Sequence, residues 1–96
     1  MPFAARRKLK ENPSKPVFVC EHETEWCNRY YTRPNKDEAL EEAETCMRKG
    51  IANCQDKRKY NAVLQSLNSG NITKALGCWN RIDSKDTIRV AEYKAA

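Results

Sequence analysis

The stretch TRPNKDEALEEAETCMRKGIANCQDKRKYNAVLQSLNSG, residues 32–70, decides the fold because it reads as two amphipathic helices separated at Gly50. Asn35 offers a capping side-chain oxygen, and Glu38 follows at the spacing of a capping box. Apolar residues then recur at steps of three and four along one stripe: Ala39, Leu40, Ala43, Cys46 and Met47. Because Arg48 and Lys49 suit the end of a helix and glycine readily terminates one, the pattern predicts a helix over residues 36–49.

The second amphipathic segment begins near Asn53 or Asp56 and ends at Gly70. Its apolar residues follow the i, i+3, i+4, i+7 rule of a helix face: Tyr60, Val63, Leu64 and Leu67. The opening turn of this predicted helix contains three consecutive cations, Lys57, Arg58 and Lys59. Since that end of a helix dipole favours anions, the cluster is interpreted either as a solvated basic segment or as a site for a bound anion.

Two hairpin-like regions flank the helical stretch. Residues 17–21 and 26–32 are rich in β-branched and aromatic residues and read as strands joined by a turn at 22–25. After the helices, residues 72–82 and 87–93 read as a second pair of strands around the turn-forming residues 83–86. The sequence therefore predicts an α+β fold: a four-stranded antiparallel sheet in the order β-β-α-α-β-β, with two helices packed on one face.

A basic N-terminal segment, residues 1–16, precedes a single small α+β domain, residues 17–96. The segment contains five cations against Glu11: Arg6, Arg7, Lys8, Lys10 and Lys15. Its three prolines argue against regular structure. It is interpreted either as a flexible tail that keeps the protein soluble or as an arm that neutralises phosphates. The net charge of the chain, +5, favours an anionic partner.

Three potential metal ligands, Cys20, His22 and Cys27, occur in the first hairpin with the spacing C-x-H-x4-C. Cys46 or Cys54 would have to supply the fourth ligand of a tetrahedral zinc site. The paired C-x-x-C spacing of zinc ribbons is missing, so we expect no metal and no other cofactor. A small zinc-binding module remains an alternative interpretation.

No catalytic motif is present: there is no phosphate loop, serine elbow or dinucleotide-binding glycine pattern. A Cys–His nucleophile needs an orienting third group, and a chain of 96 residues leaves little room for a substrate cleft. We therefore expect a protein that is not an enzyme and has no small-molecule substrate. The odd number of cysteines, five, favours reduced thiols. With no signal peptide and no run of about 20 apolar residues, we expect a cytoplasmic protein that does not contact membranes.

Aromatic and basic residues alternate in two places, and these are the residue types that stack on bases and contact phosphates. One group lies in the first hairpin: Trp26, Arg29, Tyr30, Tyr31 and Arg33. Trp79 and Arg81 form the other. The competing interpretation is that one aromatic face belongs to the core. Because Tyr30 and Tyr31 point to opposite faces of a strand, at least one of them is expected to be exposed.

The leading functional hypothesis is a small basic module that binds RNA or a ribonucleoprotein complex. Size, charge pattern and the lack of a catalytic motif are similar to those of small phage proteins that block host machinery, so an inhibitor of an RNA-guided (CRISPR-type) defence complex is the specific version. The alternative is a structural accessory subunit of a large assembly, such as a ribosome or respiratory complex. The predicted binding residues are Arg6, Arg7, Lys8, Lys10, Arg29, Arg33, Lys57, Arg58, Lys59 and Arg81.

Overall fold

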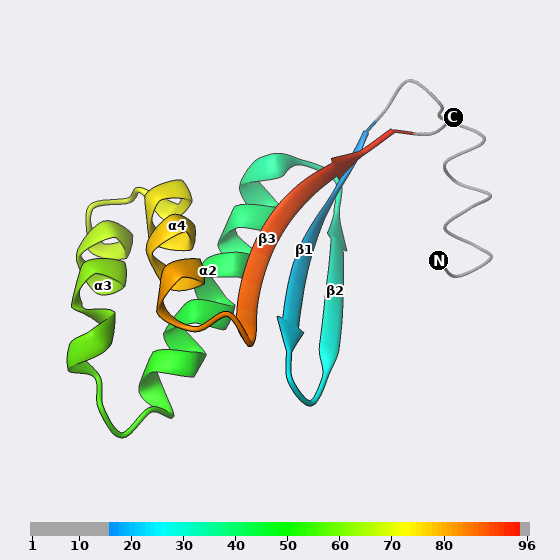
Figure 1. Cartoon of the computed structure of the whole chain (residues 1–96). Helices are drawn as coiled ribbons and strands as arrows, with labels where there is room; N and C mark the ends of the chain where they lie inside the picture. The colour runs from blue at the N-terminus through cyan, green and yellow to red at the C-terminus, as the bar shows by residue number, and fades with distance from the viewer. Residues whose placement is uncertain (1–15, 95–96) are drawn as a thin grey trace.

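The computed structural model describes residues 16–94, and the predicted basic arm lies almost entirely outside that range. The elements follow in the order β1 (Val17–Thr24), β2 (Asn28–Arg33), α2 (Lys36–Ala52), a 3₁₀ turn η1 (Arg58–Tyr60), α3 (Asn61–Asn68), α4 (Ile72–Ile82) and β3 (Asp86–Tyr93). Three antiparallel strands form one sheet in the order β2-β1-β3, and the helices gather on one side of it (Figure 1). The predicted α+β class is confirmed.

The central strand β1 pairs with a neighbour on each side, and its register defines the two faces of the sheet. Cys20 stands opposite Tyr31 on β2 and Val90 on β3, and all three lie on the face that packs against the helices. Side chains alternate along a strand, so the neighbouring positions belong to the other face. We call that other face the open face; it consists of Val17, Val19, Glu21, Glu23, Asn28, Tyr30, Thr32, Thr87, Arg89, Ala91 and Tyr93.

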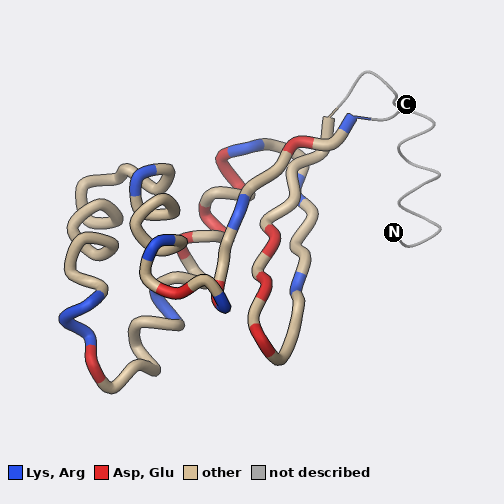
Figure 2. Tube along the Cα trace, in the orientation of Figure 1, with Lys and Arg blue, Asp and Glu red and all other residues tan. Residues whose placement is uncertain are grey.

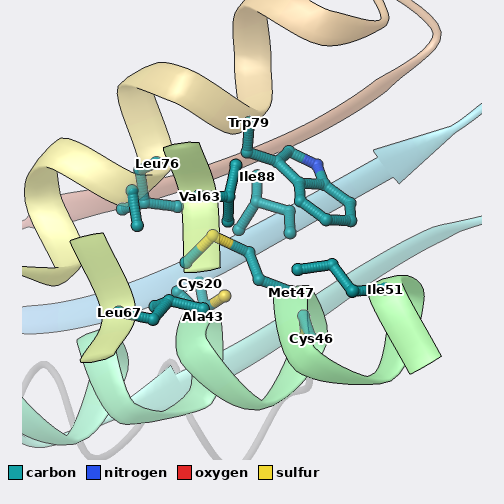
Figure 3. Packing of buried hydrophobic residues seen from close by; sticks show 11 residues of the cluster. Cys20, Ala43, Cys46, Met47, Ile51, Val63, Leu67, Leu76, Trp79 and Ile88 are labelled. Atoms are coloured by element: carbon teal, nitrogen blue, oxygen red, sulfur yellow. The ribbon is translucent and has the colours of Figure 1, made fainter. Parts of the chain in front are cut away.

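The core lies between the sheet and the helices, and its shape follows from the small residues of α2. Ala39 and Ala43 are fully buried on the side of α2 that also buries Met47. Because alanine side chains are short, α2 approaches β1 closely. Figure 3 shows the resulting cluster, which unites α2, α3, α4 and two strands through Cys20, Ala43, Cys46, Met47, Ile51, Val63, Leu67, Ala75, Leu76, Trp79 and Ile88.

The predicted strand over residues 72–82 is wrong, because this segment forms helix α4. The Asn71 side chain accepts a hydrogen bond from the Lys74 backbone N–H at 3.1 Å and caps the helix. Ala75, Leu76 and Trp79 are buried at helical spacing. The pattern that suggested a strand was the placement of Leu76, Cys78 and Ile82 at even positions. The predicted four strands and the order β-β-α-α-β-β are therefore wrong as well.

The first predicted helix begins as expected but does not end at Gly50. The Asn35 side chain accepts from the Glu38 backbone N–H at 2.9 Å, which confirms the predicted cap. At its other end α2 continues to Ala52 and buries Ile51. Gly50 lies under the indole of Trp79, where an added Cβ atom would stand 2.6 Å from Cη2. Here the glycine permits a close approach of two helices and does not terminate one.

The segment after α2 differs in detail from its prediction. Lys57–Lys59 precede α3 and largely form the 3₁₀ turn η1, so they are not in the opening turn of the α-helix. Gly70 does follow α3 and has a positive φ of 81°, which confirms it as the residue that ends this helix.

Both strands of the first hairpin also shift from their predicted bounds. β1 extends to Thr24, so His22 lies within a strand rather than in the turn. The Thr24 hydroxyl donates to the Cys27 carbonyl at 2.7 Å and accepts from its backbone N–H at 2.9 Å, which fixes the turn.

One side chain of α4 closes part of the outer edge of β3. Asn80 donates from Nδ2 to the Ile88 carbonyl at 2.9 Å, and its Oδ1 accepts from the Ile88 backbone N–H at 2.8 Å. These are the two bonds that a neighbouring strand would make with Ile88. The amide side chain thus occupies the pairing site at this point of an edge strand.

Candidate binding face

The open face carries two exposed tyrosines and an arginine around a buried carboxylate. Tyr30 is 56% exposed and Tyr93 is 49% exposed. Glu21 lies between them on the central strand, opposite Tyr30 on β2 and Arg89 on β3. The described helices lie on the other side of the sheet, so these side chains are held by strands alone (Figure 1).

Glu21 organises the arginine and one of the tyrosines. It is only 7% exposed, and it accepts a hydrogen bond from the Tyr93 hydroxyl and another from Arg89 Nη2, the latter at 3.0 Å. The bond to Glu21 raises the pKa of the Tyr93 phenol, so Tyr93 stays a neutral donor at physiological pH. A buried carboxylate needs such partners to offset its desolvation, and the result is a fixed orientation for Arg89 and Tyr93.

This arrangement suits flat, partly charged ligands. Aromatic rings and guanidinium planes on a sheet are the groups on which single-stranded bases stack. The register also places Val17, the first residue of β1, beside Tyr93. The basic segment that precedes Val17 in the sequence therefore joins the fold next to the tyrosine.

The predicted binding residues of β2 do not lie on the open face. Arg29 is exposed, but it stands opposite His22 and so belongs to the helix-side face. Arg33 also belongs to that face; it donates to the Thr32 carbonyl at 2.8 Å and pairs with Glu42 on α2 at 3.0 Å. Arg33 thus has an acidic structural partner, whereas the exposed Arg29 guanidinium interacts with the Cys27 and Tyr31 side chains, which raises its pKa.

The remaining described candidates are exposed but lie elsewhere. The segment Lys57–Lys59 lies at the opposite end of the molecule from β2 (Figure 2). Within it, Arg58 lies 3.5 Å from Asp56, and Lys59 stands 5.3 Å from the centre of the Tyr60 ring. Arg81 is exposed in the last turn of α4. The predicted basic residues within 16–94 therefore do not gather into one patch, and Arg6, Arg7, Lys8 and Lys10 lie outside the described residues.

The positive charge of the chain is concentrated in its N-terminal segment. Residues 16–94 contain thirteen Lys and Arg against twelve Asp and Glu, a net charge of +1, while the whole chain carries +5. Four of the five net charges thus belong to residues 1–15. Residues 16–94 are nearly neutral, so the open face offers stacking more than electrostatic attraction.

The tip of the first hairpin presents a single large aromatic side chain. Trp26 is 90% exposed, and the turn that carries it is fixed by the Thr24–Cys27 hydrogen bonds. Glu23 and Glu25 precede this position in the sequence. Tryptophan is usually largely buried in folded proteins, and Trp is enriched among residues that anchor protein interfaces.

The predicted ligand set Cys20, His22 and Cys27 does not assemble. Cys20 is buried against the helices, whereas Cys27 is exposed at the hairpin tip. Among residues 16–94 no group of three or more Cys, His, Asp or Glu side chains has a geometry suited to a metal ion. The zinc alternative therefore has no supporting geometry in this part of the chain.

The sequence reasoning missed Arg89 and Tyr93, which are central to the open face. The signal was present in the alternation of β3, because Thr87, Arg89, Ala91 and Tyr93 occupy every second position. The prediction selected Arg29 and Arg33 instead, because aromatic and basic residues are interleaved in the first hairpin. The exposure predicted for one of the two adjacent tyrosines is confirmed: Tyr30 is exposed and Tyr31 packs against the core.

Comparison with known proteins gives no relative: no protein-family model, curated protein or solved structure matches this chain. None of the helices in residues 16–94 combines the length and apolar character that crossing a membrane requires.

Proposed function

We propose that this chain is a non-enzymatic module that binds single-stranded RNA, on its own or within a ribonucleoprotein complex. The observation that carries the proposal is the open face, where Tyr30 and Tyr93 are exposed on either side of the Arg89–Glu21 pair. In this binding mode the tyrosine rings stack on unpaired bases. Arg89, fixed by Glu21 and 65% exposed in its side chain, contacts a base plane or a phosphate.

The N-terminal segment supplies the electrostatic part of the affinity. It carries four of the predicted binding residues, Arg6, Arg7, Lys8 and Lys10, and it joins β1 beside Tyr93. Each phosphate that these cations neutralise releases about one counterion, which favours binding at low salt. The N-terminal segment thus contributes charge to the interface, and the open face contributes stacking.

The other predicted residues are proposed as contacts for a longer RNA. Lys57, Arg58 and Lys59 form an exposed basic loop away from β2, and Arg29 and Arg81 are exposed on other elements. A phage-encoded inhibitor of an RNA-guided defence complex, acting in the host cytoplasm, is the specific version of this proposal. Such an inhibitor would bind the guide strand or the target strand of the complex through its open face.

A second candidate function is that of an accessory subunit in a large assembly, which Trp26 favours. An indole that is 90% exposed on a fixed turn, with Glu23 and Glu25 just before it in the sequence, suits a protein partner with an apolar pocket and a basic rim. The negative charge at this tip makes it unsuited to RNA. If this is the main function, the isolated chain should lose solubility relative to its Trp26→Ser variant.

The RNA proposal predicts that replacing both Tyr30 and Tyr93 with alanine weakens binding of a labelled RNA of about six nucleotides by ten-fold or more at every salt concentration. The reason is that base stacking on an aromatic side chain contributes about 1–3 kcal/mol per base. Fluorescence anisotropy at two salt concentrations, with the single-stranded oligonucleotide and with an RNA duplex of the same sequence, measures this effect.

The matched control replaces Lys57, Arg58 and Lys59 with alanine. Folding should change little, because surface substitutions usually cost within about 0.5 kcal/mol. For an RNA of about twenty nucleotides we expect a ten-fold loss of affinity at low salt and a smaller salt slope, since phosphate contacts are lost. Binding of the short RNA should be unchanged. Equal affinity of the parent protein and the tyrosine variant for the short RNA would refute stacking on the open face.

A further inference from the structure

A polar hollow lies at one end of the open face, next to the tip of the first hairpin. Its volume is about 270 Å³, just below the range of about 300–1,000 Å³ that is usual for pockets that take drug-sized ligands. The hollow therefore has room for a single sugar or base. Its lining comes from the first hairpin, the turn before β3 and β3 itself: Glu23, Thr24, Glu25, Asn28, Ser84, Lys85 and Thr87.

The hollow lies beside the stacking residues of the open face. Glu23 stands opposite Asn28 on β2 and Thr87 on β3, and together they form one row across the sheet. The next row of the same face consists of Tyr30, Glu21 and Arg89. Two residues along a strand span about 7 Å. Because one bond joins the base and the sugar of a nucleotide, a base stacked on Tyr30 brings its ribose to the row that contains Glu23.

The charges of the lining favour a neutral ligand with hydroxyl groups over a phosphate. The lining has two carboxylates, Glu23 and Glu25, and one ammonium group, Lys85. Figure 2 shows acidic residues following one another along β1 to the hairpin tip. Lys85 Nζ lies 3.9 Å from Glu25 Oε1, so the charge of Glu25 is partly offset. Glu23 is half-buried in β1, and its carboxylate accepts hydrogen bonds while it repels anions.

We propose that this hollow binds the 3′-terminal ribose of a single-stranded RNA, whose 2′- and 3′-hydroxyls both donate to the Glu23 carboxylate. The site rests on the proposed function, since it takes the end of the strand whose bases stack on the open face. Only the last nucleotide has two free neighbouring hydroxyls, because every other ribose carries a phosphate on O3′. Carboxylates accept hydrogen bonds from ribose hydroxyls in dinucleotide-binding folds, and the 2′-hydroxyl distinguishes RNA from DNA. Asn28 and Thr87 donate to the same hydroxyl oxygens.

The distribution of charge then determines the direction of the bound strand. The hollow at the 3′ end is acidic, whereas four of the five net charges of the chain belong to residues 1–15, which join β1 beside Tyr93. The strand runs from the hollow over Tyr30 and Arg89 towards Tyr93, so its phosphates approach the cations of the N-terminal segment. The acidic tip, which repels phosphates, thus marks the place where the strand ends.

The test compares RNAs of about six nucleotides that share a fluorescent label at the 5′ end and differ only in the last ribose: a free 2′,3′-diol, a 2′,3′-dideoxy end or a 3′-phosphate. Fluorescence anisotropy with the full chain measures the three dissociation constants. We expect the dideoxy end to weaken binding about ten-fold, because hydrogen bonds to a charged group are lost. The 3′-phosphate should weaken binding further at low salt, because it is repelled by Glu23.

Two outcomes of this comparison contradict the proposal in different ways. Equal affinity for the diol and dideoxy ends would overturn the ribose site and leave the proposed function in place. Failure to bind any of the three RNAs would refute the proposed function as well.

Two variants separate Glu23 from the general charge of the hairpin tip. Glu23→Gln keeps the size of the side chain and removes its charge. We expect this variant to bind the dideoxy RNA as the parent protein does and to lose most of the ten-fold preference for the diol end, since charge-assisted hydrogen bonds are about twice as strong as neutral ones. Glu25→Gln is the matched control and should keep the preference, because Glu25 is paired with Lys85. Equal loss of the preference in both variants would overturn the role of Glu23, and so would a uniform loss of affinity for all three RNAs in Glu23→Gln.

Discussion

Replacing Trp79 with alanine is expected to lower the free energy of unfolding by about 3–5 kcal/mol, the usual cost of emptying a large aromatic site in a core. Trp79 is only 3% exposed. Its ring packs on Gly50 and stacks with Tyr60 at a centroid distance of 5.1 Å. Because α4 contacts α2 through this side chain, the variant loses the anchor between two helices. Urea unfolding followed by circular dichroism measures the loss.

The second tryptophan provides the control for this prediction. Trp26 is 90% exposed, so Trp26→Ala removes an equal volume without leaving a cavity. Its free energy of unfolding should change by no more than ordinary surface substitutions cause, about 0.5 kcal/mol. If both variants lost the same stability, the burial assigned to Trp79 would be wrong.

Substituting alanine for Gly50 is expected to destabilise the fold by about 1–3 kcal/mol, although the same change in an exposed helix interior normally stabilises it. The new Cβ atom would lie 2.6 Å from Trp79 Cη2. That ring is buried and rigidly packed, so it cannot turn aside as a flexible side chain would. Overpacking therefore outweighs the gain in helix propensity, which is about 1 kcal/mol. Thermal unfolding of the variant measures the balance.

Gly77 is the matched glycine, because it also lies inside a helix but has no neighbouring atom within 4 Å of an added Cβ. Gly77→Ala should raise stability by about 0.5–1 kcal/mol, since alanine loses less backbone entropy on folding than glycine. The diagnostic result is a loss of stability in Gly50→Ala together with a gain in stability in Gly77→Ala. A stabilising Gly50→Ala substitution would mean that the indole does not rest on the α2 backbone.

The elements with complete local signals were the ones that the sequence predicted well. Asn35 and Glu38 mark the start of α2, and the stripe of small apolar residues fixes its buried side. Residues 72–82 were predicted as a strand because Leu76, Cys78 and Ile82 all occupy even positions, although the buried residues of this segment follow helical spacing. Gly50 looks like a terminator, and only the tertiary position of Trp79 reveals its role.

The candidate site depends on contacts between residues that lie far apart in the sequence, and a pattern of charges does not reveal such contacts. Nothing in the sequence around Glu21 marks it as a central residue, yet pairing across 68 residues with Arg89 makes it the centre of the open face. His22 lacked an orienting partner until β3 brought Asp86 beside it, 64 residues away. Basic residues were easy to list from the sequence, but whether they share a surface depends on the order of the strands.

The Asn80–Ile88 bonds limit how copies of this chain can associate. Open-ended addition of strands, as in fibrils, requires two free edges on every copy, one to receive a neighbour and one to offer the next. Here an incoming strand at β3 must first displace both bonds of the Asn80 amide, whereas within residues 16–94 the strand β2 pairs with β1 alone. Association through main-chain pairing is therefore directed to β2, and two copies joined there would leave no equally accessible edge for a third.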